Sequence, residues 1–174
     1  MKIILASLFG ALALLMLPSC SSQMKARGTR LEHNFQYGRT AYLDHKGHAH
    51  VPPRAPRAVK KMVAAANRIV DKPYKYGGGH RSFNDTGYDC SGSVSYVLNA
   101  GGKLQRPLVS QNFLDYGKKG YGKWVTVYVR KGHVFMEIAG LRFDTGGTWN
   151  STGPRWKPQS RGISKYYVRH PRGL

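Results

Sequence analysis

The chain has 174 residues, with 28 Lys and Arg against eight Asp and Glu, and a formal net charge of +20 at neutral pH. This length has room for one domain and a tail, which excludes a protein of several large domains. A hydrophobic content of 41% is sufficient for a modest core.

The first 19 residues have the pattern of an export signal. They begin with Lys2, continue as an apolar run from Ile3 to Leu17, and end directly before Cys20. Residues 17–20, Leu-Pro-Ser-Cys, resemble the cleavage box of bacterial lipoproteins, and this resemblance implies a lipid on Cys20 that anchors the protein to a membrane. An ordinary signal peptide and an uncleaved anchor are the alternatives.

The location and the charge together limit the partners that we expect. The two serines after Cys20 lack the Asp that often marks retention in the inner membrane, so the sequence predicts the outer membrane, facing the periplasm, if the host has one. A basic chain can bind nucleic acid, but export argues against it. Anionic envelope polymers, lipid headgroups and the carboxylates of peptidoglycan are the expected partners, and a solvated basic surface is the alternative.

Residues 20–57 have the composition of a linker. They are rich in Lys and Arg and end in a cluster of prolines at positions 52, 53 and 56, which predicts a mostly flexible tether. His45, His48 and His50 are close enough in sequence to bind a metal ion. No Cys or ordered scaffold accompanies them, so a polar tether is the preferred interpretation, and no metal or cofactor is predicted.

Residues 58–71 carry apolar side chains at intervals of three and four, and Pro73 follows, so a helix that packs on the core is expected there. The glycines at 77–79 lack the Lys-Ser/Thr of a phosphate-binding loop. They are expected to let the backbone pass close to Cys90. His80, beside them, is a candidate site residue, with an ordinary surface histidine as the alternative.

A second helix is predicted to begin at Cys90. Asp89 is a good N-cap residue, apolar positions follow four, seven and eight residues after Cys90, and the glycines at 101–102 end the helix. Unpaired N–H groups and the helix dipole in the first turn favour a thiolate and can stabilise an oxyanion. A small buried hydrophobic residue is the alternative role for Cys90.

The C-terminal half is expected to be mainly strands. A short helix over 110–116 precedes a strand over 124–130, a turn is predicted at 153–156, and a last strand at 163–168. Between them, residues 133–138 and 141–144 form a predicted hairpin.

The hairpin would bring two polar side chains together. With Ala139-Gly140 as a two-residue turn, Ile138 pairs with Leu141, and alternation places His133 and Asp144 on the same face as diagonal neighbours. Such neighbours are about 7–8 Å apart at the backbone, a gap that a His and an Asp side chain can close. A histidine oriented by a carboxylate and brought to a thiol at a helix start is the arrangement of nucleophilic cysteine catalysis.

Three segments resemble the NlpC/P60 family of cell-wall cysteine peptidases, a papain-like group. They are residues 73–79 (Pro-Tyr-Lys-Tyr-Gly-Gly-Gly), 88–92 (Tyr-Asp-Cys-Ser-Gly) and 132–134 (Gly-His-Val), and the match extends over about residues 58–146. The chain departs from the family in two respects. Asp144 stands where His, Asn or Gln is frequent, and residues 124–129 replace a Gly-Asp-Leu segment.

This resemblance implies an α+β fold in which N-terminal helices pack on an antiparallel sheet, with residues 58–174 as the catalytic domain. It implies a peptidoglycan endopeptidase that cleaves a stem-peptide amide, the bond between γ-D-glutamate and the diamino acid. Cys90 would be the nucleophile, His133 the base and later the acid, and Asp144 the residue that orients the imidazole. Further candidates for oxyanion or substrate binding are Ser91, Tyr74 and His80.

Two other classes of function are compatible with the same residues. One is an amidase or acyltransferase that uses this scaffold on a different substrate. The other is a lipoprotein without catalytic activity that binds the cell wall or anionic lipid and keeps Cys90 as a relic. The presence of all three polar positions favours an enzyme.

Overall fold

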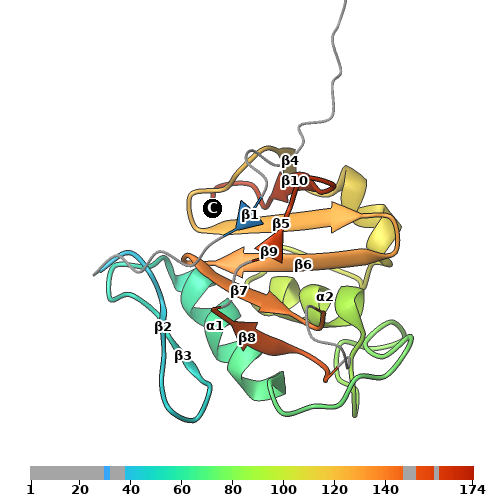
Figure 1. Ribbon diagram of the computed structural model, residues 1–174, viewed down its shortest axis with the longest axis horizontal. Coiled ribbons are helices and arrows are strands. Elements are labelled where there is room, and N and C mark those ends of the chain that lie inside the picture. Colours follow the sequence, from blue (N-terminus) through green and yellow to red (C-terminus); the bar gives the residue numbers. More distant parts are fainter. Residues whose placement is uncertain (1–29, 32–37, 147–151, 159–160) are drawn as a thin grey trace, which may run out of the picture.

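The computed structural model describes residues 30–31, 38–146, 152–158 and 161–174. A six-stranded antiparallel sheet with the order β4-β10-β5-β6-β7-β8 forms its centre, and both α-helices lie together beside the half of the sheet that contains β6 to β8 (Figure 1). The elements of this layer are α1 (Arg57–Ile69), α2 (Cys90–Ala100), β4 (Lys118–Lys119), β5 (Val125–Arg130), β6 (His133–Ile138), β7 (Leu141–Asp144), β8 (Arg155–Lys157) and β10 (Tyr167–His170). The expected α+β class is confirmed.

Two small antiparallel pairs and a 3-10 helix complete the described fold. One pair is β2 (Tyr42–Leu43) with β3 (Ala49–His50), and the other is β1 (Arg30–Leu31) with β9 (Arg161–Gly162). The 3-10 helix η1 (Ser110–Asp115) corresponds to the short helix predicted at 110–116. Within the described residues, no helix has the length and apolar character needed to span a membrane.

The main core lies between the helices and the sheet. The apolar positions of α1 face inward, as their spacing predicts, and include Val59, Met62 and Ile69. From the sheet, alternate residues of β5, β6 and β7 point toward the same core, because successive side chains of a strand face opposite sides. This packing fixes the position of α2 against β6.

The opposite side of the sheet carries a second, smaller core. Phe135 and Tyr128 are stacked there with ring centroids 4.7 Å apart. The residues of this cluster are Tyr128, Phe135, Ile163, Tyr166 and Val168. The chain around β9 therefore covers the sheet face to which His133, Phe135 and Asp144 belong.

The hairpin of β6 and β7 has the predicted register. Ile138 pairs with Leu141, and the chain turns through Ala139 (φ 48°) and Gly140 (φ 76°). Positive φ at both central residues is the conformation of a two-residue type I′ turn. Because of this register, β7 ends beside the start of β6, near α2 (Figure 1).

The expected tether over residues 20–57 is corrected by the structure from residue 38 onward. Residues 42–50 form the β2-β3 hairpin, which packs on α1, and Ala41, Ala49 and Ala55 are buried in the main core. The side chain of Asn67 on α1 holds the hairpin, since it accepts from the Ala49 N–H and donates to the Ala49 carbonyl, both at 2.9 Å. The folded unit therefore begins before residue 58.

Two predictions in the C-terminal part are also wrong in detail. The turn expected at 153–156 leads into strand β8, because Trp156 packs on Phe143 (5.0 Å between centroids) and pairs with it in register. The last strand begins at Tyr167 and not at residue 163, because Tyr166 donates a backbone hydrogen bond to Ile163 and closes a turn there.

Candidate active site

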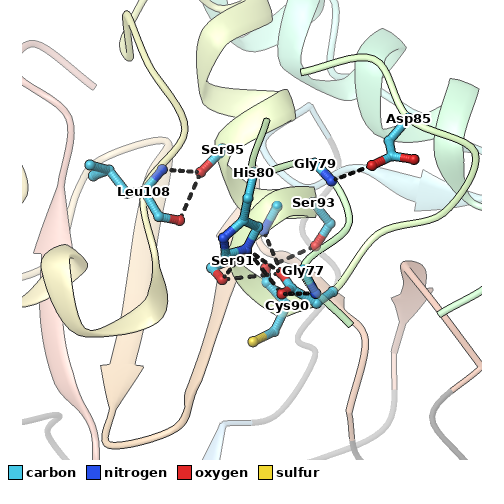
Figure 2. Close-up of polar contacts among 11 residues, drawn as sticks. Gly77, Gly79, His80, Asp85, Cys90, Ser91, Ser93, Ser95 and Leu108 are labelled. Carbon is cyan, nitrogen blue, oxygen red and sulfur yellow. Dashed lines mark hydrogen bonds and ion pairs between the residues drawn. The ribbon is translucent and has the colours of Figure 1, made fainter. Parts of the chain in front are cut away.

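Cys90 is the first residue of α2, as predicted. Asp89 caps the helix by accepting a hydrogen bond from the Gly92 N–H at 2.8 Å. The N–H groups of Cys90 and Ser91 belong to the first turn and therefore have no acceptor within the helix. Cys90 is partly exposed, and its sulfur points away from the polar contacts of His80 and Ser91 (Figure 2). The thiol and two backbone donors are thus both present at the start of the helix.

The glycines at 77–79 allow the preceding loop to lie directly against this helix. A Cβ on Gly92 would be 1.9 Å from the carbonyl oxygen of Gly78, and a Cβ on Gly78 would be 2.3 Å from the carbonyl oxygen of Gly87. No side chain fits at such distances. The expectation that these glycines permit a close backbone approach near Cys90 is confirmed.

His133 lies between Asp144 and Cys90. Its Nε2 is 2.9 Å from Asp144 Oδ1, and the same ring interacts with the Cys90 thiol. Because Nε2 is engaged with Asp144, Nδ1 is the nitrogen left for the sulfur. The His133 side chain is 12% exposed and that of Asp144 is fully buried. The structure therefore brings together the three residues that the sequence singled out.

Both oxygens of Asp144 face donors or cations. Oδ1 accepts the Gly146 N–H at 2.8 Å in addition to its contact with His133. Oδ2 is 3.0 Å from Nη1 of Arg161 and 3.6 Å from Nη1 of Arg142. Neither arginine is predicted from the sequence to belong to the site. The strand alternation that places Arg142 on the same face as Asp144 could have revealed the first, whereas no local pattern indicates Arg161.

The ionisation of the pair follows from these contacts. Burial opposes the charge of the His133 ring, but the hydrogen bonds to Asp144 and Cys90 and the charges of both outweigh it, so the pKa of His133 is raised above its ordinary value. Burial also opposes the charge of Asp144. The pKa of this carboxyl is nevertheless below its ordinary value. The causes are the hydrogen bond and charge of His133, the charge of Arg161 and the hydrogen bond from the Gly146 N–H. The arrangement favours an imidazolium next to a carboxylate.

The other candidates have different positions. His80 Nε2 is 3.0 Å from the Asp89 carboxylate and 3.1 Å from Ser91 Oγ (Figure 2). Ser91 is buried, and its hydroxyl donates to Asp89, so only its backbone N–H remains for a substrate. Burial, followed by the charges of Cys90 and Asp89, raises the pKa of Tyr74, which is 39% exposed. Cys20 lies outside the described residues.

Comparison with known proteins finds similar solved structures. No family model matches the chain, and no curated protein matches it. Among solved structures, a mutated form of the Resuscitation Promoting Factor Interacting protein RipA is 24% identical, with a TM-score of 0.49, over 68% of this chain and 66% of that one. A Staphylococcus aureus subsp. aureus Mu50 protein, described as similar to lipoprotein, NLP/P60 family, is 20% identical, with a TM-score of 0.46, over 67% of this chain and 43% of that one.

The chain thus covers less than two thirds of either neighbour. Both TM-scores are below 0.5, so the chemistry of the site rests on the geometry of the chain's own residues.

Proposed function

We propose that this protein is an NlpC/P60-type cysteine peptidase that hydrolyses amide bonds in the stem peptides of peptidoglycan. The observation that carries the proposal is the position of His133, which contacts Asp144 through Nε2 and the Cys90 thiol with the same ring. A structural cysteine has no need of a buried, carboxylate-bound histidine beside it. The three residues also stand in the order of the family motifs.

The first half of the reaction uses the thiolate. Cys90 attacks the carbonyl carbon of the scissile amide and forms a tetrahedral intermediate, whose oxyanion accepts hydrogen bonds from the backbone N–H groups of Cys90 and Ser91. The His133 imidazolium then gives its proton to the leaving amine, the C–N bond breaks, and an acyl-enzyme and a neutral imidazole remain.

The second half restores the enzyme. Neutral His133 takes a proton from a water molecule, which attacks the thioester carbonyl, and Cys90 leaves as a thiolate beside the imidazolium. Throughout the cycle, Asp144 keeps the ring in one orientation and one tautomer. His133 donates the proton in the first half of the reaction and accepts one in the second half, so no further acid or base is needed among the described residues.

The choice of substrate rests on the sequence. The motifs at 73–79, 88–92 and 132–134 resemble those of cell-wall peptidases, and the N-terminal signal predicts export to the compartment that contains peptidoglycan. We therefore propose the bond between γ-D-glutamate and the diamino acid as the scissile bond, and a lipid on Cys20 as the anchor that holds the enzyme at the outer membrane.

The test is product analysis after incubation of the purified chain with peptidoglycan. Cys90→Ala and His133→Ala should each abolish peptide release, and the double variant should be scarcely worse, because residues that act as one unit are not additive. Asp144→Asn keeps a hydrogen-bond acceptor but loses the charge, so activity should fall without vanishing, and Asp144→Ala should be slower still.

Because His133 has a raised pKa, activity should decline only as the pH rises well past about 6.5.

His45→Ala is the matched control, since this exposed histidine lies on the turn between β2 and β3. It should leave peptide release unchanged. If Cys90→Ala released peptides at the rate of the wild type, the role of Cys90 as the nucleophile would be refuted. If the wild-type protein bound the cell wall but released no peptides, the peptidase function would be refuted. A binding protein without catalytic activity would then be the remaining function.

A further inference from the structure

Arg161 is held in place from three sides. Its Nη1 is 3.0 Å from Asp144 Oδ2, its Nη2 donates to the Tyr166 hydroxyl at 2.6 Å, and its Cζ is 4.9 Å from the centroid of the Phe135 ring. The side chain is only 14% exposed. A guanidinium stacked on a buried ring and fixed at one end has little freedom to leave the carboxylate.

The contact with Asp144 acts through charge. Among the described residues, none donates an aligned hydrogen bond to Oδ2, although Nη1 is within 3.0 Å of it. His133 and the Gly146 N–H both engage Oδ1. The two oxygens of Asp144 therefore have separate partners, with the histidine on one and the arginine on the other.

Arg161, the second partner of Asp144, becomes important at one stage of the reaction cycle. When His133 has passed its proton to the leaving amine, the ring is neutral and no longer balances the charge of Asp144. A fully buried carboxylate without a cation would tend to take up a proton itself, because burial disfavours its charged form. A protonated Asp144 would no longer stabilise the imidazolium that must form in the next step.

We propose, on the basis of the peptidase function above, that Arg161 is a positioning residue that keeps Asp144 ionised and oriented while His133 is neutral. Arg161 acts through Asp144 and does not touch the reacting atoms. Its place on β9 allows this, since β9 and the turn to Tyr166 cover the sheet face on which Asp144 and His133 lie.

Other charged or titratable groups also face the pair. Arg142 is more distant from Oδ2, at 3.6 Å, and Lys157 influences Asp144 without an ion pair to it. The charged or titratable groups that surround His133 and Asp144 are Cys90 on α2, Arg130 on β5, Arg142 on β7, Arg155 and Lys157 on β8, Arg161 on β9 and Tyr166. Of the described Arg and Lys side chains, that of Arg161 is closest to the carboxylate.

The test is an NMR titration of His133 in the full chain, without substrate. Removal of a positive charge next to Asp144 raises the proton affinity of the carboxylate and of the imidazole that is hydrogen-bonded to it, so Arg161→Met should raise the pKa at which the His133–Asp144 pair takes up its proton by about 0.5 to 1 unit, a three- to tenfold gain in proton affinity. Arg161→Lys keeps the charge and should restore most of the wild-type value. A merely structural role predicts the opposite sign, because a loosened pair would return the His133 pKa toward its ordinary, lower value.

Arg68→Met is the matched control. Arg68 donates to the Tyr96 hydroxyl at 3.2 Å and lies over the ring of that tyrosine, but it is an exposed residue of α1 and has no ion pair with Asp144. It should leave the titration of His133 unchanged. If Arg161→Met does not fold, Arg161→Gln provides the same loss of charge with a side chain that can still bind the Tyr166 hydroxyl.

Turnover gives a second, separable readout. Arg161→Met should lower kcat at least tenfold with little change in KM, should accumulate acyl-enzyme, and should be rescued by Lys. An unchanged or lowered His133 pKa in both neutral variants would overturn the inference even if the wild type cleaves peptidoglycan. If the wild type cleaves nothing, the proposed function fails, and the titration still decides whether Arg161 sets the proton affinity of His133.

Discussion

Gly92→Ala tests how tightly the helix of Cys90 is set against the loop before it. The added Cβ would be 1.9 Å from the Gly78 carbonyl oxygen and 3.1 Å from the Cα of Gly79. Both neighbours are backbone atoms, which cannot rotate away as a side chain would. Since Cβ contacts below 3.0 Å essentially do not occur, the helix and the loop must separate by at least about 1.1 Å.

The magnitude follows from two opposing effects. Overpacking against a backbone costs about 3 kcal/mol, the upper end of the usual range, and replacing Gly by Ala within a helix returns about 1 kcal/mol. The net loss of about 2 kcal/mol corresponds to a fall in Tm of about 4–8 °C for a chain of this size. The displacement also moves Cys90, so alkylation of the thiol by iodoacetamide should be slower at neutral pH.

Thermal unfolding by circular dichroism and the alkylation rate are the two assays. Gly102→Ala, at the other end of the same helix, is the control, because its added Cβ would meet no atom within 4 Å and only its φ of +68° opposes the change. That variant should lose about 1 kcal/mol and alkylate like the wild type. A Gly92→Ala protein with a Tm within about 2 °C of the wild type and normal alkylation would show that the expected overlap relaxes freely.

Two further substitutions test other parts of the structure. Asn67→Ala removes a side chain that makes two hydrogen bonds with Ala49 and accepts one from Trp156 Nε1 at 2.8 Å. Urea unfolding should therefore show a free energy of unfolding lower by about 3 kcal/mol. A decrease below about 1 kcal/mol would contradict the role of Asn67 as a link between β3 and β8. Cys20→Ala should abolish incorporation of radiolabelled fatty acid, and unchanged labelling, or a wild-type chain that takes up none, would disprove the lipid anchor.

The parts of the site that follow local rules could be predicted from the sequence. The helix at Cys90 depends on an N-cap, a helical period and a glycine stop, which all lie within thirteen residues of each other. The contact of His133 with Asp144 depends on a two-residue turn and the alternation of two strands. In both cases the determining residues are close neighbours in the chain.

The parts that depend on distant partners could not be predicted. The β2-β3 hairpin consists of strands of two residues each, which are too short to show an alternating pattern, and its position is fixed by Asn67, which lies on α1. Arg161 approaches Asp144 only because the chain after β8 folds back over the sheet and packs Ile163 and Tyr166 on Phe135. No periodic pattern around Arg161 records that packing.

The pairing of β1 with β9 gives the N-terminal segment a part in the site. Leu31 is the register partner of Arg161, so the stretch of chain nearest the predicted lipid anchor flanks the strand that carries the arginine. In the lipid-anchored peptidase proposed above, a cut on the C-terminal side of β1 would therefore separate the folded unit from its anchor and, in the same event, remove the strand that pairs with β9.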